Sequence, residues 1–406
     1  MRRAKLAHST TMGAFRDRLR EVWCNPAMHP FVRFLSEFKT KQLGVLIDDL
    51  SASRAALVAP IEQISPDDVN RILSLSGGLT LVALSPERAN TFMLASMARP
   101  TTTLDRKAIS PSLPHFVSVE AREGITTGIS AADRARTLNI LGAQLPQPRA
   151  LVKPGHIFPV ATREGGVLVK TEIPEGALDI VRLAGFTDAA LYVDLLNESG
   201  ELVDGESAER LARDEGLPVT TLSQLISYRL AHESLVARVA DAALPTTLAG
   251  DVRAIVYRSS ISDVEHVALV KGDVRTAETV LVRVQAEHTV ADVFGGSSPA
   301  SRAHLQNSLA AIGERGCGVL LYLRRPFLDS KNSNTQQLRE EATSPKNAAM
   351  MREYGVGAQI LRDLGITNVE LLSGTQRSLE GLASFGISVV KQHPIPPLLP
   401  SPGHTV

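Results

Sequence analysis

The sequence predicts an α/β (α+β) protein of two domains, and three observations lead to that prediction. The chain has 406 residues, which is enough for two separate cores. Short β-branched runs alternate with runs of helical period along its length. Between residues 243 and 251 the stretch ALPTTLAGD, with a proline and a glycine, interrupts this alternation. We therefore expect one domain on each side of this interruption.

The expected strands recur in both halves of the chain. They are GVLIDDL, LTLVAL, FVSVEA and ALYVDLL in the first half, and HVALVKGD, TVLVRVQAE, GVLLYLRR and VELLSG in the second. Apolar residues at every third or fourth position predict helix within residues 209–241. The last stretch, KQHPIPPLLPSPGHTV, contains five prolines and predicts a disordered tail. The predicted segments are an N-terminal extension over 1–29, domains over 30–240 and 250–395, and a proline-rich tail over 396–406.

Bulk composition argues against a nucleic-acid or anionic-membrane partner. The chain carries 43 basic and 43 acidic residues, so no attraction to polyanions is expected. Its two cysteines, Cys24 and Cys317, provide neither a disulfide framework nor a four-cysteine zinc site, which suits the reducing cytoplasm. No apolar run reaches the roughly 18 residues that span a bilayer. The basic start MRRAKLAHSTTMGAFRDRLREVW leaves a transit peptide as the alternative to a cytoplasmic location.

Two motifs in the first half contain chemically useful groups. Residues 124–137 read GITTGISAADRART, a turn whose N–H groups and hydroxyls are suited to an oxyanion, followed by a helix that Ser130 can cap. An ordinary capped helix without a ligand is the alternative. Further on, KPGHIFPV predicts that His156 lies in a turn, where it is more available for chemistry than on a helix face. A purely structural histidine is the alternative there.

Taken together, these stretches resemble a known family. GITTGISAADRA, PGHIFPV, EGGVL, LDIVRLAGF and LSQLISYR resemble 3,4-dihydroxy-2-butanone 4-phosphate synthase over about residues 30–235. That enzyme converts ribulose 5-phosphate into a four-carbon phosphate and formate in riboflavin biosynthesis. EHVALVKGD, VLVRVQAE, GVLLYLRR and EYGVGAQILRDLG resemble GTP cyclohydrolase II over about residues 250–395. The order matches the bifunctional riboflavin-pathway proteins of bacteria and plants, which implies a synthase-like α/β domain followed by a cyclohydrolase-like α/β domain.

The resemblance to the synthase implies a sugar-phosphate site. His156 and Asp194 are the expected catalytic residues, although Asp194 stands where the family has a glutamate. The positions expected to bind the substrate phosphate are Thr126, Thr127, Gly128, Asp133, Arg134 and Lys170, with Lys170 in place of an arginine.

The resemblance also implies a divalent-metal site, and this sequence departs from the family there. Carboxylates and a histidine suit Mg²⁺ or a similar ion. In LIDDLSASRAALVAPIE the pair Asp48–Asp49 remains, but the family's acidic positions hold Ala52, Arg54 and Ala56. Ile173 stands where a ligating histidine is expected. Because isoleucine cannot ligate and arginine repels cations, we expect no metal here. An active synthase domain would either hold Mg²⁺ through the Asp48–Asp49 pair or work without metal.

In the second half the resemblance implies an open zinc site made by three cysteines, whose bound water attacks the purine. The three positions are His288, Pro299 and Ser301 in this sequence. Proline has no donor atom and serine is a poor zinc ligand, so we expect neither zinc nor GTP ring opening. An alternative site built from His288, His304 and Glu287 stays open.

Three functions are compatible with these residues. The first is a non-catalytic or regulatory partner in the riboflavin pathway, as a homodimer or a mixed dimer with an active paralogue, with a sugar phosphate as a candidate ligand. The second is a diverged lyase that acts on ribulose 5-phosphate or a related sugar phosphate through His156 and Asp194. The third is an ordinary bifunctional enzyme, which the altered metal positions oppose. The first is favoured.

Overall fold

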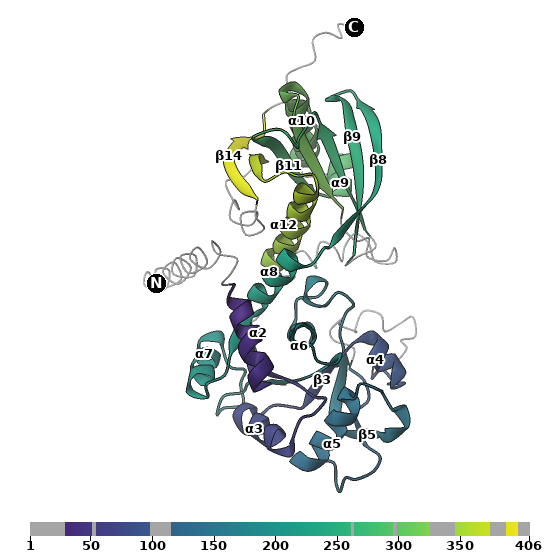
Figure 1. Ribbon diagram of the computed structural model, residues 1–406, viewed down its shortest axis with the longest axis vertical. Coiled ribbons are helices and arrows are strands. Elements are labelled where there is room, and N and C mark those ends of the chain that lie inside the picture. Colours follow the sequence, from purple (N-terminus) through teal and green to yellow (C-terminus); the bar gives the residue numbers. More distant parts are fainter. Residues whose placement is uncertain are drawn as a thin grey trace. The chain divides into compact units, whose positions relative to one another are not determined.

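Both halves of the chain fold around a mixed sheet. The computed structural model describes residues 29–50, 54–97, 115–260, 264–294, 299–324, 346–373 and 387–396 (Figure 1). The chain divides into two units between Tyr228 and Arg229. Each unit contains one seven-stranded sheet, so the predicted two-domain α/β class is confirmed. Among the described residues, no helix is long and apolar enough to cross a membrane.

The first unit has the strand order β4-β5-β3-β6-β2-β1-β7. Strands β3 and β5 are parallel, as are β1 and β7, whereas the other neighbouring pairs are antiparallel. The strands are β1 Gly44–Asp48, β2 Arg54–Pro60, β3 Leu81–Leu84, β4 Val119–Ala121, β5 Leu151–Ala161, β6 Ala189–Asp194 and β7 Val219–Thr221. The four strands predicted in this half correspond to β1, β3, β4 and β6.

Helices cover both faces of this sheet. The helices are α2 Pro30–Lys41, α3 Pro66–Ser76, α4 Pro86–Thr91, α5 Ala131–Gly142, α6 Ile173–Ala184, α7 Gly205–Asp214 and α8 Leu222–His232, with short 3₁₀ turns at Pro148–Ala150 and Gly166–Leu168. One face carries an apolar core, in which Val82, Leu57 and Val193 pack with apolar residues of α3, α5 and α7. Helix α6 lies against β1, β2, β3 and β6. Its first turn lies beside the site described below.

The second unit has the strand order β14-β13-β11-β12-β10-β9-β8. Its strands are β8 Val236–Thr246, β9 Gly250–Ser259, β10 Glu265–Lys271, β11 Val280–Ala286, β12 Gly318–Leu323, β13 Asn368–Ser373 and β14 Ser388–Pro394. Its helices are α9 Thr289–Phe294, α10 Pro299–Arg315 and α12 Lys346–Asp363. Ile312 of α10 packs with Leu281, Leu320 and Leu372 of the sheet. The four strands predicted in this half correspond to β10, β11, β12 and β13.

Two predictions about secondary structure were wrong. Helix was expected as far as residue 241, but α8 ends at His232 and the segment from Val236 is strand β8. Pairing of β8 with β9 along its length overrides the helical spacing of its apolar residues. The stretch KQHP, expected in the disordered tail, belongs to β14 and pairs with β13. Residues 397–406 lie outside the described part of the chain.

Candidate functional site

The two predicted catalytic residues lie at the same end of the first sheet. Strand β3 runs between β5 and β6, and Leu81 pairs with Phe158 on one side and with Tyr192 on the other. His156 lies two residues before Phe158, and Asp194 lies two residues after Tyr192. Because β5 is parallel to β3 and β6 is antiparallel to it, both residues lie beyond the start of β3. Because adjacent strands are about 4.8 Å apart, this register separates the backbones of His156 and Asp194 by roughly 10 Å.

The turn at Thr126–Gly128 is held by the carboxylate of Asp133. The N–H and hydroxyl of Thr126 donate to Asp133 at 3.1 and 2.9 Å, and Gly128 N–H donates at 3.0 Å. Ser130 Oγ accepts from Asp133 N–H at 3.1 Å, which confirms the predicted cap of α5. Desolvation raises the pKa of Asp133, but the hydrogen bonds from Thr126, Gly128 and Ser130 together lower it below its ordinary value. Asp133 therefore shapes the turn and occupies two of its N–H groups, and Thr127 is left exposed.

A histidine–glutamate pair packs directly against this turn. His156 Nδ1 lies 2.9 Å from Glu120 Oε2, which joins β5 to β4. Gly128 has a φ of 79°, and a Cβ on it would lie 2.7 Å from His156 Nδ1 and closer still to Glu120. Only glycine fits there. His156 lies within strand β5, so its predicted place in a turn was wrong, but it is exposed and the turn lies beside it.

A second group of charges surrounds the buried side chain of Tyr192. Burial raises the pKa of Tyr192, the charges of Asp194, Glu175 and Glu172 raise it further, and Arg54 lowers it. Burial also raises the pKa of Asp194, against the effect of Arg54. Asp194 Oδ1 is buried and has no hydrogen-bond partner among the described residues. These charges therefore lie close together at the end of the sheet that carries Asp194.

Glu175, which sequence reasoning missed, is fully buried in the first turn of α6. Its Oε1 accepts from Arg163 N–H at 3.1 Å, and its Oε2 has no partner within the described chain. Burial raises the pKa of Glu175 from its ordinary 4.5 to about 7, against the opposing charge of Lys170. Lys170 itself forms an ion pair with Glu172 at 3.1 Å. Near neutral pH Glu175 is suited to both proton donation and proton acceptance.

We expect Glu175→Gln to flatten the pH dependence of stability. Between pH 4.5 and 7 the unfolded chain releases this proton while the folded chain keeps it, so the wild-type free energy of unfolding falls as the pH rises. At about 1.4 kcal/mol per pKa unit, the fall between pH 5 and 8 is about 2–3 kcal/mol and is absent in the variant. Urea unfolding at both pH values measures it, with the exposed Glu198→Gln as the control. Equal pH slopes in wild type and Glu175→Gln would contradict the burial account.

The aspartate pair after β1 is already engaged by the protein. Asp49 Oδ1 accepts from Ser223 N–H at 3.1 Å, and Asp49 Oδ2 accepts from the Ser223 hydroxyl. These bonds tie the end of β1 to the first turn of α8. Asp48 is 2% exposed, and its Oδ1 accepts from Leu50 N–H at 3.1 Å. The pair therefore anchors backbone, which does not match the ligand role expected for it in an active synthase.

The other metal positions also do not fit a divalent cation. Ile173 begins α6 and is fully buried. Arg54 begins β2 and contributes a positive charge beside Asp194. Ala56 is buried within β2, and Ala52 lies outside the described residues. No group of three His, Cys, Asp or Glu side chains in the described chain could hold a metal ion.

In the second unit, Ser301 belongs to a hydrogen-bonded cluster centred on Asp292. Ser301 Oγ donates to Asp292 Oδ1 at 2.5 Å and accepts from Gln285 Nε2 at 3.1 Å. Tyr322 hydroxyl and His288 N–H donate to Asp292 Oδ2 at 2.9 and 2.8 Å. This Asp292 cluster joins α9, α10, β11 and β12 through side-chain hydrogen bonds. Asp292 and Tyr322 had no role in the sequence interpretation.

The remaining predicted zinc positions do not converge. The side chain of His288 is exposed, and Pro299 is the first residue of α10. Glu287 accepts from Thr289 at 3.0 Å and lies 3.8 Å from Arg324. Burial and then the charge of Arg283 lower the pKa of His304. Because Ser301 is committed to Asp292, these side chains do not fit a zinc ion.

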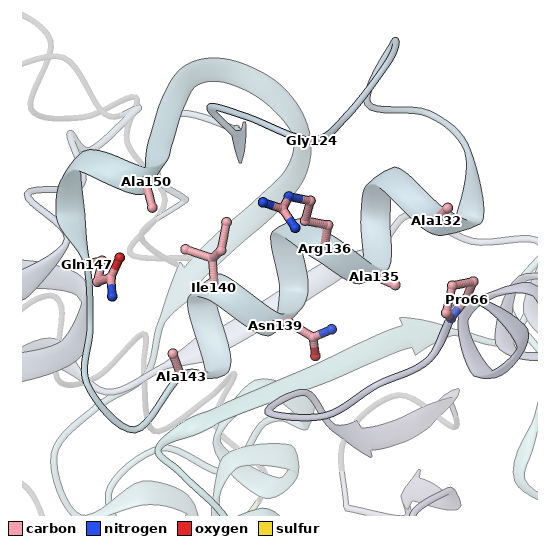
Figure 2. Close-up of a pocket in the computed structure, with 10 residues that line it drawn as sticks. All are labelled: Pro66, Gly124, Ala132, Ala135, Arg136, Asn139, Ile140, Ala143, Gln147 and Ala150. Carbon is pink, nitrogen blue, oxygen red and sulfur yellow. The ribbon is translucent and has the colours of Figure 1, made fainter.

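A cavity of about 520 Å³ lies on the flank of α5, away from these residues (Figure 2). Arg136 points toward Gly124 there, and Arg136 Nε donates to Glu123 O at 2.5 Å. Asn139 Nδ2 donates to Ile64 O at 3.1 Å. The lining residues are Pro66, Gly124, Ala132, Ala135, Arg136, Asn139, Ile140, Ala143, Gln147 and Ala150. None of them is a predicted catalytic, phosphate or metal residue, although Gly124 and Ala132 are neighbours in sequence of the turn and of Asp133.

Comparison with known families assigns each unit. The profile of 3,4-dihydroxy-2-butanone 4-phosphate synthase matches residues 33–228, and that of GTP cyclohydrolase II matches residues 237–394. The riboflavin biosynthesis protein RibBA of Bacillus cereus (strain ATCC 14579) is 33% identical over 381 residues, covering 90% of this chain and 93% of the relative. RibBA of Aquifex aeolicus (strain VF5) is 32% identical over 379 residues, covering 89% and 91%.

Among solved structures, RibBX from A. baumannii is similar over both units. It is described as a two-domain 3,4-dihydroxy-2-butanone 4-phosphate synthase. The TM-score is 0.70 at 29% identity, and the match covers 86% of this chain and 95% of that one. The similarity therefore extends across both sheets.

Proposed function

This chain belongs to the family of two-domain riboflavin biosynthesis proteins, in which a 3,4-dihydroxy-2-butanone 4-phosphate synthase domain precedes a GTP cyclohydrolase II domain, and from that premise we propose that it is a non-catalytic partner that binds a sugar phosphate. It acts in the cytoplasm, in or beside the riboflavin pathway. Its first domain binds the ligand, and its second domain does not open GTP. The residues for anion binding are present, whereas those for divalent metals are not.

The observation that carries this proposal is the contact between the Thr126–Gly128 turn and the His156–Glu120 pair. Asp133 holds the turn in shape without a ligand, so little order has to be gained on binding. Thr127 is exposed and directly precedes Gly128, which packs against the pair, so its hydroxyl is a candidate donor to a phosphate oxygen. A site that is preorganised in this way supports ligand binding even where catalysis is absent.

Arg134 adds a cation to the same end of the sheet. Arg134 Nη1 donates to Thr80 Oγ1 at 3.0 Å. Its Nε is buried and has no partner within the described residues. A buried guanidinium N–H without an acceptor is costly, and a phosphate oxygen would supply that acceptor. This unsatisfied group supports an anionic ligand next to the turn.

Calorimetry and product analysis of the full chain test the proposal. We expect ribulose 5-phosphate to bind with a measurable Kd, while neither formate nor a four-carbon phosphate accumulates with or without Mg²⁺. GTP with added Zn²⁺ should be recovered unchanged. Mass spectrometry follows both reactions. Turnover of either substrate at a rate comparable to an active RibBA protein would overturn the non-catalytic assignment.

We expect Asp133→Asn to weaken ribulose 5-phosphate binding at least tenfold. An amide NH₂ in place of one carboxylate oxygen faces N–H or O–H donors from Thr126 and Gly128, so the turn loses its shape. Asp204→Asn is the matched control, because Asp204 caps α7 by accepting from Ser207 N–H at 2.8 Å and asparagine caps equally well. Equal weakening by both variants would show that the Thr126–Gly128 turn does not contribute specifically to ligand binding.

The partner is part of the same proposal. A homodimer, or a mixed dimer with an active two-domain relative, would give a non-catalytic chain its regulatory effect. Co-expression of the two tagged chains followed by tandem purification and light scattering measures the mixed species. Recovery of this chain only as a monomer, with no change in the relative's activity, would leave ligand binding as its sole supported property.

A diverged lyase is the second candidate function, and Glu175 is the observation that favours it. A carboxyl with a pKa of about 7 near Asp194 and Tyr192 is suited to proton transfer on a ketose phosphate. The two functions differ in one readout, since only a lyase releases formate from ribulose 5-phosphate or converts a related sugar phosphate. In that case Glu175→Gln abolishes turnover while Asp204→Asn does not.

A further inference from the structure

We propose that the guanidinium of Arg54 binds the sugar end of the ligand directly, so that the site takes a ketose phosphate without any divalent cation. The inference rests on the proposed sugar-phosphate site. It goes further by naming the group that recognises the oxygens at the sugar end of the ligand. Arg54 and Asp194 would bracket those oxygens, one as a donor and the other as an acceptor.

Strand register brings Arg54 and Asp194 to the same face of the sheet. Ala56 of β2 pairs with Asp194 of β6. Cross-strand partners point to the same face, and so does the residue two positions earlier on the same strand, which is Arg54. The neighbouring residues Ala55 and Leu57 point to the opposite face and belong to the apolar core. Arg54 is thereby directed toward the α6 side, where Tyr192 and Asp194 lie.

Two polar groups here have no hydrogen-bond partner in the described part of the chain. Among the described residues, no hydrogen bond or ion pair within 4.0 Å involves the Arg54 side chain, and Asp194 Oδ1 is buried without a partner. Their charges nevertheless influence each other. Two opposite charges that are close but not in contact leave space for a polar group between them. A hydroxyl that donates to Asp194 and a carbonyl oxygen that accepts from Arg54 would satisfy both.

Of the other cations near the site, Lys170 has a carboxylate partner and Arg134 is assigned to the phosphate end of the ligand. Lys170 pairs with Glu172 at 3.1 Å, and Arg134 Nη1 donates to Thr80. Arginine also suits the task because its planar guanidinium is permanently charged and offers five donors, whereas a metal ion requires several deprotonated ligands. The fixed charge of Arg54 would further repel a divalent cation from Asp194. Binding without metal is therefore the expected state of this site.

Calorimetric titration of the full chain with ribulose 5-phosphate, in EDTA and in excess Mg²⁺, tests the inference. We expect wild-type Kd values that agree within about twofold in the two buffers. Arg54→Gln should weaken binding at least tenfold in both, and Arg54→Lys should recover part of the loss. Arg33→Gln is the control, because Arg33 is a surface residue that pairs with Glu37 on its own helix at 3.1 Å. Circular dichroism confirms that each variant is folded.

Failure of this inference is distinguishable from failure of the proposed function. Wild-type binding that requires Mg²⁺, or Arg54→Gln binding as tightly as wild type, would overturn the role of Arg54 while sugar-phosphate binding stands. Absence of wild-type binding in both buffers would overturn both statements. If Arg54→Gln gains affinity only when Mg²⁺ is added, Arg54 excludes a metal but does not replace it, which also contradicts the proposal.

Discussion

Replacing Asp292 by alanine is expected to lower the free energy of unfolding of the second unit by about 3 kcal/mol, through loss of hydrogen bonds to a buried carboxylate. Asp292 is 7% exposed and accepts from Ser301 Oγ, Tyr322 hydroxyl and His288 N–H at 2.5, 2.9 and 2.8 Å. Alanine leaves these three donors without their acceptor. Because Ser301 belongs to α10 and Tyr322 to β12, the effect reaches beyond α9, the helix that contains Asp292.

Urea unfolding followed by circular dichroism measures this effect, and a chelator separates it from metal binding. Asp273→Ala is the matched control, because Asp273 lies in an exposed turn and its side chain accepts from the nearby Arg275 N–H at 3.1 Å. That change should cost less than about 1 kcal/mol. EDTA should leave wild-type stability unchanged. Stoichiometric zinc in the purified chain, or a chelator effect as large as that of Asp292→Ala, would mean that the cluster is not what holds these elements.

Gly155→Ala is expected to destabilise the first unit by more than about 3 kcal/mol, with loss of the His156–Glu120 contact. A Cβ on Gly155 would overlap the backbone of Val119 and lie 2.5 Å from Glu120 N. Backbone of the adjacent strand cannot rotate aside as a side chain can, so β4 and β5 must move apart. Gly155 N–H would also lose its bond to Ser118 Oγ, which is 3.1 Å long.

The same substitution elsewhere in the chain provides the control. Gly357 lies within α12, and a Cβ on it would find its nearest neighbour at 3.8 Å. Gly357→Ala should therefore stabilise by up to about 1 kcal/mol, through helix propensity. Thermal unfolding compares the two variants, and titration with ribulose 5-phosphate reports on the site. A Gly155→Ala protein with wild-type unfolding and wild-type affinity would show that β4 and β5 tolerate the extra atom.

Local features of this fold were predictable from the sequence, whereas the partners within the sites were not. Ser130 stands directly before the helical run that follows the turn, and this position predicted the observed cap. The contacts of Glu120 with His156 and of Tyr322 with Asp292 join residues 36 and 30 positions apart. No local spacing encodes such pairs, because the order of strands in the sheet decides them.

Tertiary pairing also explains the residues whose conformation was misassigned. KPGHIFPV contains two prolines and a glycine, which favour a turn, yet His156 lies in β5 because β3 pairs with the same strand. Glu175 could have been noticed as an acid within the apolar run IPEGALDIVRLA. Its shifted pKa depends on complete burial, which emerges only when α6 packs on the sheet.

In the β1–β2 hairpin, the effect of an inserted residue on the direction of Arg54 depends on where the insertion lies. Asp48 pairs with Arg54 across the hairpin, and the alternation along β2 directs residue 54 to one face and Ala55 to the other. An insertion in the connection lengthens a loop and leaves this alternation intact. A single residue inserted between Arg54 and Ala55 would turn the guanidinium into the apolar layer. When relatives are compared, the position of an alignment gap therefore matters as much as the aligned residue for deciding on which face of the sheet a charge lies.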